Sequence, residues 1–141
     1  MVIVDANVLI YAVDRASSHH EASYSWLEGA LNGSETVGLA WTVLLAFIRL
    51  STSPSVFPTP WSASRAMDQV ELWLSAPAAV IAEPTLRHAN VIRALLADAG
   101  TAGNLTTDAH LAALAIEHAA EIVSYDREFA RFGGVRHRLP G

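Results

Sequence analysis

A chain of 141 residues with 52% hydrophobic and 16% charged residues is long enough for one packed core and too apolar for a disordered tail. The absence of cysteine excludes a disulfide scaffold and a thiolate zinc site. The net charge of -5 argues against a broad nucleic-acid-binding surface, but all nine basic residues are arginine and four of them lie in the last fifteen positions. We therefore expect one domain, residues 1–141, with at most a local basic patch.

The opening segment MVIVDANVLIYAV is apolar, but it lacks the features of a secretion signal. It has no basic n-region and no small-residue cleavage site, and it contains Asp5. No stretch of the chain reaches the roughly 20 apolar residues that span a bilayer. We expect a soluble, cytoplasmic protein that has no membrane partner.

In the first half of the chain, apolar runs alternate with residues that begin or end helices. Ser18 with Glu21 three residues later fits a capping box, and Asn32-Gly33 ends the helix that it opens. The prolines of the loop STSPSVFPTP end a later helix. The expected elements are strands at 2–4 and 37–39 and helices at 6–13, 19–31 and 41–50.

The second half repeats this alternation. Thr59-Pro60 suits an N-cap followed by proline at the first helical position, and Gly100 ends a later helix. The expected elements are strands at 80–82 and 122–124 and helices at about 60–75, 86–99 and 108–118. Strands that alternate with helices indicate an α/β fold, with a mainly parallel sheet covered on both faces.

Three acids share a predicted position at the C-terminal side of this sheet. Asp5 follows the first strand, Asp108 opens a helix and Asp126 follows the last clear strand. Each has an alternative role as a helix cap or as a partner of a helix dipole. Two carboxylates at about 4 Å repel by roughly 4 kcal/mol at an effective dielectric constant near 20, so a cluster needs a proton or a cation. Mg²⁺ or Mn²⁺ is the natural partner for such oxygen ligands.

Two sequence motifs resemble those of a known family. The run VDANVLIYAVD resembles the N-terminal motif of PIN domains, and NLTTDAHLAALAIEHAAEIVSYDREFARF resembles the C-terminal motif of VapC-type toxins from bacterial VapBC toxin–antitoxin pairs. The intervening WTVLLAFIRLST is similar to the family's central motif. The resemblance implies a PIN-like three-layer α/β fold, with a mainly parallel five-stranded sheet between helices. It also implies a metal-dependent endoribonuclease that forms a homodimer and binds RNA and a VapB-type antitoxin.

By the same resemblance, individual residues match the family's site. Asp5, Asp108 and Asp126 match the catalytic acids that hold Mg²⁺ or Mn²⁺. Glu128 matches a further metal-site acid, although a solvated glutamate in the first turn of a helix is an equal alternative. Asn7 matches a polar position beside the first acid, although a capping or turn contact is an equal alternative. We expect these acids to lie together at one edge of the sheet.

One residue departs from the family pattern. Many members carry a glutamate in the central helix where this chain has Ala46, which can neither bind a metal nor accept a proton. A degenerate PIN domain that binds RNA or antitoxin without cutting is therefore a competing hypothesis. A phosphatase of the haloacid-dehalogenase type is a weaker one, because it normally needs DxD where this chain has Asp5-Ala6-Asn7.

Other polar residues have less definite roles. The histidines do not form the HExxH zinc pattern, and most of them are expected on the surface or in packing. His110, two positions after Asp108, is the best candidate among them for a contact near the acids. Arg49, on the same predicted helix as Ala46, fits either a phosphate contact or a structural ion pair.

Overall fold

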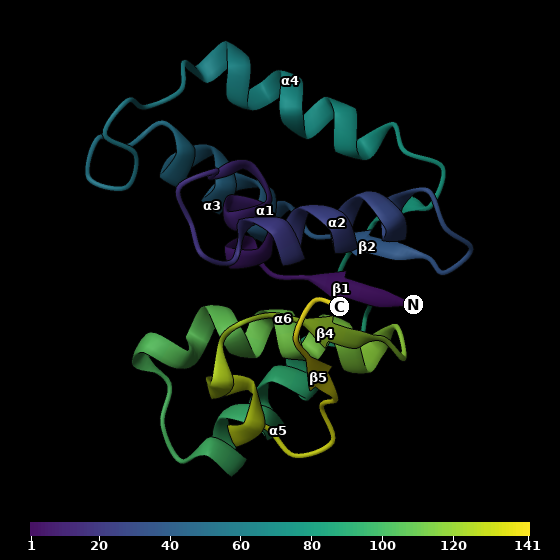
Figure 1. Cartoon of the computed structure of the whole chain (residues 1–141). Helices are drawn as coiled ribbons and strands as arrows, with labels where there is room; N and C mark the ends of the chain where they lie inside the picture. The colour runs from purple at the N-terminus through teal and green to yellow at the C-terminus, as the bar shows by residue number, and fades with distance from the viewer.

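A computed structural model describes all 141 residues, and it contains a five-stranded sheet between two layers of helices (Figure 1). The strand order is β3-β2-β1-β4-β5, and every neighbouring pair is parallel. The strands are β1 (Val2–Val4), β2 (Val37–Leu39), β3 (Ala79–Ile81), β4 (Glu121–Val123) and β5 (His137–Arg138). The α/β fold with a parallel five-stranded sheet is thereby confirmed.

The helices divide between the two faces of the sheet (Figure 1). One face carries α1 (Ala6–Val13), α2 (His20–Leu31), α3 (Trp41–Ser51) and α4 (Ala63–Leu74). The other carries α5 (His88–Ala99) and α6 (Thr106–Glu117). Two short 3₁₀ helices, η1 (Gly103–Leu105) and η2 (Arg127–Arg131), flank α6 in the chain. No helix has the length and apolar character needed to cross a bilayer.

The core holds the central strand rigidly. All three residues of β1 are buried, and so are Ala109 and the run Leu111–Ala115 of α6, whose alanines permit close packing on the sheet. In β2, a Cβ added at Gly38 would lie 2.8 Å from Met1 Cε and 3.1 Å from Ile3 Cγ1, so a larger residue here would require the Met1 and Ile3 side chains to shift. The carboxyl end of β1 is therefore a fixed platform for the residues that follow it.

Four of the six predicted helix starts differ from the structure, by one to three residues, at α2, α4, α5 and α6. The helix expected from Thr59-Pro60 begins at Ala63, because the Ser62 hydroxyl accepts a hydrogen bond from the Arg65 N–H at 3.1 Å and caps it there. The helix expected from a Ser18 capping box begins at His20, and its N-cap residue makes no side-chain capping bond. Strand β5 was expected only from the family resemblance, since two residues are too few to show a periodic pattern.

Candidate functional site

Asp5 lies where β1 passes into α1, and its carboxylate is held by three donors. Oδ1 accepts the Ala6 N–H at 2.7 Å, which makes Asp5 the N-cap of α1. Oδ2 accepts the Ser124 hydroxyl at 2.6 Å and the Asn7 amide at 3.2 Å. Burial raises the pKa of Asp5, the hydrogen bonds from Ser124 and Ala6 oppose that rise, and the charge of Asp126 adds to it. Asp5 is thus a fixed and desolvated carboxylate.

Ser124 and Asn7 connect the ends of the two central strands. Ser124 follows β4 and is 1% exposed, and its hydroxyl also accepts the Asp126 N–H at 2.9 Å. The Asn7 amide donates to the Ser124 oxygen at 3.1 Å, while its own oxygen accepts the Tyr125 N–H at 3.2 Å. Asn7 therefore has a structural role in which it orients Asp5, in addition to its capping-type contacts.

Asp126 and Glu128 lie at the start of η2. Asp126 Oδ1 accepts the Glu128 N–H at 2.9 Å, so Asp126 caps this short helix, and its second oxygen has no protein partner. One oxygen of Glu128 forms an exposed ion pair with Arg131 at 3.2 Å. Each of the two acids thus keeps a carboxylate oxygen available for a ligand.

Asp108 comes from the opposite side of the sheet, in the first turn of α6. Its carboxylate accepts no hydrogen bond from the protein. Burial is the largest of the effects that raise its pKa to about 6, and the charges of Asp126, Asp5 and Glu128 are the others. The four predicted acids therefore lie within electrostatic reach of one another at the carboxyl edge of the sheet. Three of them, with Arg131, line an open pocket of about 510 Å³ next to η1.

The donor set of this acidic cluster (Asp5, Asp108, Asp126 and Glu128) suits a hard divalent cation. All its ligand atoms are carboxylate oxygens, and Arg131 is the one basic group paired with it. In the present side-chain arrangement no three carboxylates converge closely enough to hold an ion. To hold an ion, the Asp108 carboxylate, which has no hydrogen bond, and the Glu128 side chain, which is paired with Arg131, would have to turn toward Asp5 and Asp126. The residues fit a divalent cation by their chemistry, with Asp5 as the fixed member.

Other residues named from the sequence lie elsewhere or make no contact with the acids. The His110 ring does not contact the acidic cluster, because it faces α5 and bonds to His88 Nε2 at 2.8 Å. Arg49 is exposed, and none of the ion pairs includes it. Ala46 is half-buried on α3, a helix that packs against α1. The sequence reasoning missed Ser124, for which the only signal was a polar residue directly after a buried strand.

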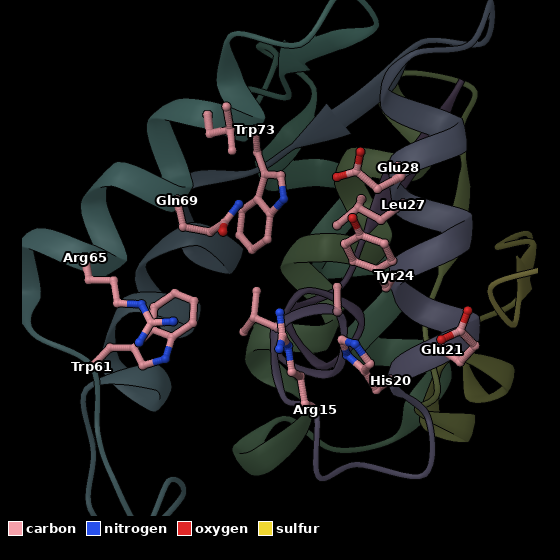
Figure 2. A pocket seen from close by; sticks show the side chains of 13 residues that line it. Arg15, His20, Glu21, Tyr24, Leu27, Glu28, Trp61, Arg65, Gln69 and Trp73 are labelled. Atoms are coloured by element: carbon pink, nitrogen blue, oxygen red, sulfur yellow. The ribbon is translucent and has the colours of Figure 1, made fainter.

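A second cavity, of about 560 Å³, lies on the helical face formed by α1, α2 and α4 (Figure 2). Figure 2 shows Trp61, Arg65 and Trp73 across this cavity from the side chains of α2. The Arg65 guanidinium lies 4.0 Å from the centre of the Trp61 ring. None of the four acids lines this cavity, so it is separate from the acidic cluster.

Comparisons with known proteins agree with this arrangement. A family model described as the PIN domain matches residues 2–135. Ribonuclease VapC37 of Mycobacterium tuberculosis is 55% identical over 140 residues, which cover 99% of this chain and 97% of that protein. Ribonuclease VapC43 of the same species is 44% identical over 141 residues, which cover 99% and 95% of the two chains.

Solved structures with low sequence identity share the fold. VapBC2 from Rickettsia felis, bound to a DNA fragment from its promoter, gives a TM-score of 0.71 at 21% identity over 99% of this chain and 98% of that one. VapC20 of Mycobacterium tuberculosis, described as a toxin that cleaves the sarcin-ricin loop, gives a TM-score of 0.69 at 14% identity over 96% and 99%. At these identities the likeness concerns the fold alone.

Proposed function

Because this chain belongs to the PIN-domain family and, within it, to the VapC ribonuclease toxins, we propose that it hydrolyses RNA phosphodiester bonds at the acidic cluster with the aid of Mg²⁺ or Mn²⁺. The observation that carries the proposal is the Asp108 carboxyl, which is partly buried, has no hydrogen-bond donor and has a pKa raised to about 6. Buried structural carboxylates usually have a hydrogen-bond donor or a basic partner. Asp108 is instead available to a ligand.

We propose Asp5, Asp108 and Asp126 as the catalytic metal-holding residues and Glu128 as a further ligand. A divalent cation bound there supplies charge neutralisation at the scissile phosphate and activation of water. The protein's own contribution is orientation. Ser124 and Asn7 fix the Asp5 carboxylate, and the α1 and η2 termini fix the backbones that carry Asp5 and Asp126.

Cleavage of RNA by the purified chain, freed of any antitoxin, tests the proposal. We expect cleavage with added Mg²⁺ or Mn²⁺ and none in EDTA, and we expect Asp5→Asn to remove it. Asp98→Asn is the matched control, because Asp98 is an exposed aspartate on α5 outside the acidic cluster. Cleavage that persists in EDTA or in the Asp5→Asn variant would refute the metal mechanism.

The degenerate PIN domain is the second candidate function, and Ala46 is the observation that favours it. A chain without the usual central carboxylate could bind RNA or antitoxin with little or no catalysis. An RNA cleavage and binding assay in excess Mn²⁺ distinguishes the two functions. Cleavage that appears only at high Mn²⁺ means weak metal binding at an active site, whereas RNA binding without cleavage at any Mn²⁺ concentration supports the degenerate domain.

We further propose a VapB-type antitoxin as a partner, acting with the chain in the cytoplasm. The cavity of Figure 2 supports a docking place, because it combines the rings of Trp61 and Trp73 with charged groups such as Arg65, a lining that fits an amphipathic segment. Leu72 at its rim is 65% exposed. Leu72→Asp should weaken copurification of the antitoxin while RNA cleavage stays intact. Unchanged copurification would place the antitoxin elsewhere.

A homodimer is also proposed, on the basis of exposed apolar side chains. Leu45 on α3 is 58% exposed, Leu86 before α5 is fully exposed, and edge strand β3 exposes Val80 and Ile81. Such surface favours self-association. Light scattering at micromolar concentration should give twice the monomer mass of 15.1 kDa, and a monomer would contradict the proposal.

A further inference from the structure

A third cavity, of about 870 Å³, adjoins the acidic cluster on the β4–β5 side of the sheet. Asp126 of the acidic cluster lines this cavity, and so does Ser124, which donates a hydrogen bond to Asp5. Its remaining walls come from α1, the start of α2, η2 and the C-terminal segment. A ligand bound in this cavity would therefore lie next to the acids.

Three aromatic rings form one wall. The His19 and Tyr125 ring centres are 4.3 Å apart with a tilt of 35°, which is close to stacking. Tyr11 packs edge-on against Tyr125 at 5.2 Å and lies 5.0 Å from His19. His19 is exposed, while the two tyrosines are half-buried, so the imidazole is the outermost ring.

The ring of Tyr125 is fixed at both ends. Its hydroxyl hydrogen-bonds to the hydroxyl of Ser23, a fully buried residue of α2, at 2.8 Å. Its backbone N–H donates to Asn7, which also contacts Asp5. The aromatic wall is thus connected to the catalytic carboxylate by a short chain of hydrogen bonds. A flat group stacked there would be held at a defined position relative to Asp5.

The same cavity gathers positive charge in a protein whose net charge is -5. Arg127 and Arg138 line it. Arg138 is already paired with Glu121 at 2.8 Å and with Glu35 at 4.0 Å. Arg127 is exposed and forms no ion pair, so its guanidinium is available to an anion.

We propose that this cavity binds a nucleotide of single-stranded RNA next to the scissile phosphate, with its base stacked on His19 and a backbone phosphate at Arg127. Aromatic side chains beside a basic group are the features by which proteins hold unpaired nucleotides. The inference rests on the proposed ribonuclease function. It adds two binding residues, His19 and Arg127, which the acidic cluster does not include.

Binding of two labelled probes tests the proposal. One is a 5′-fluorescein-labelled oligoadenylate, and the other is an abasic oligoribose phosphate of the same length, which has the same charge but no bases. Fluorescence anisotropy is measured in an Asp108→Asn background, so that no cleavage is needed. RNA hydrolysis can then fail in its own assay without affecting this result, and the reverse also holds.

We expect His19→Ala to weaken oligoadenylate binding about tenfold and to leave binding of the abasic probe unchanged, since stacking requires a base. His19→Phe, which keeps a flat ring, should restore the preference for oligoadenylate. Equal loss of affinity for both probes in His19→Ala, or no loss for either, would overturn the stacking assignment.

Arg127→Ala should weaken both probes equally and reduce the slope of log affinity against log salt by about 0.7, the value for one phosphate contact on a single strand. Arg93→Ala is the matched control, because Arg93 is an exposed arginine of α5 outside this cavity. An Arg127→Ala slope equal to that of Arg93→Ala would overturn the phosphate assignment.

Discussion

Helix α6 carries two acids whose surroundings are opposite. Asp108 at its N-terminal end accepts no hydrogen bond, and burial together with neighbouring carboxylates raises its pKa to about 6. Glu117 at its C-terminal end has no exposed side-chain surface, and burial tends to raise its pKa. Hydrogen bonds from Thr85 and His88 outweigh that burial and lower the pKa of Glu117. The Asp108 carboxyl has no hydrogen-bond donor, whereas the Glu117 carboxyl accepts hydrogen bonds from Thr85 and His88.

The Glu117 carboxylate belongs to a chain of contacts that fastens α5 to α6. It accepts the Thr85 N–H at 2.9 Å and contacts His88 Nδ1, while His88 Nε2 bonds to His110 Nδ1 at 2.8 Å. Burial and the neighbouring His88 lower the pKa of His110. A titratable cluster is thus not in itself a reactive site. What distinguishes the acidic cluster is that three of its four carboxylates, those of Asp5, Asp108 and Asp126, have no basic partner.

The largest expected effect is on the rate of RNA cleavage when Asp108 is replaced. Asp108→Asn should lower the rate of RNA cleavage by about 100- to 1,000-fold, the range seen when one group that stabilises charge in a transition state is removed. The variant should stay folded, because no hydrogen bond is lost. Single-turnover cleavage in Mn²⁺ measures the rate, with Asp98→Asn as the control. Activity within tenfold of wild type would place Asp108 outside the site.

Removal of the hydrogen-bonded Glu117 carboxyl should have the opposite result: the protein loses stability, and the cleavage rate stays the same. Glu117→Ala leaves the Thr85 and His88 donors without an acceptor, which should reduce the free energy of unfolding by about 2 kcal/mol. The cleavage rate per folded molecule should not change. Urea denaturation gives the stability, and cleavage assays well below the transition give the rate. A large loss of rate with no loss of stability would mean that the two clusters act together.

A smaller effect is expected from restoring the carboxylate that this chain lacks. If the side chain at position 46 faces the acids, Ala46→Glu should tighten Mn²⁺ binding about tenfold, or about 1.4 kcal/mol. Strain in the packed helix would reduce the gain. Calorimetric titration of Mn²⁺ into both proteins decides the point. Unchanged affinity in a folded variant would show that position 46 lies away from the metal site.

The smallest effect is on the pH dependence of stability without metal. A carboxyl whose pKa is higher in the folded state than in the unfolded state destabilises the fold once it ionises. Asp108→Asn should therefore be more stable than wild type above pH 6, and this difference should disappear as the pH falls toward 4. Solvent screening limits it to about 1 kcal/mol. Thermal unfolding of both proteins in EDTA across this pH range measures the difference in stability. A difference that grows as the pH falls would contradict the prediction.

The sequence pattern alone predicted the succession along the chain of β1 to β4 and of the six α-helices, and the common edge at which the acids lie. It did so because buried strands, proline and glycine act locally, and because Asp5, Asp108 and Asp126 each sit beside such a signal. Ser124 and the pairing of His110 with His88 could not be predicted, since they depend on contacts between residues 119 and 22 positions apart. The start of α4 was missed because two competing caps, at Thr59 and Ser62, lie three residues apart.

The most direct test of the account is a crystal structure of the chain grown with Mn²⁺, with the ion located by its anomalous scattering. We predict one strong peak at about 2.0–2.6 Å from carboxylate oxygens of Asp5, Asp108 and Asp126, the range over which hard divalent cations bind oxygen. We predict no peak between His88, His110 and Glu117, where every group is already bonded to another. A peak at the histidines with none at the acids would contradict the central claim.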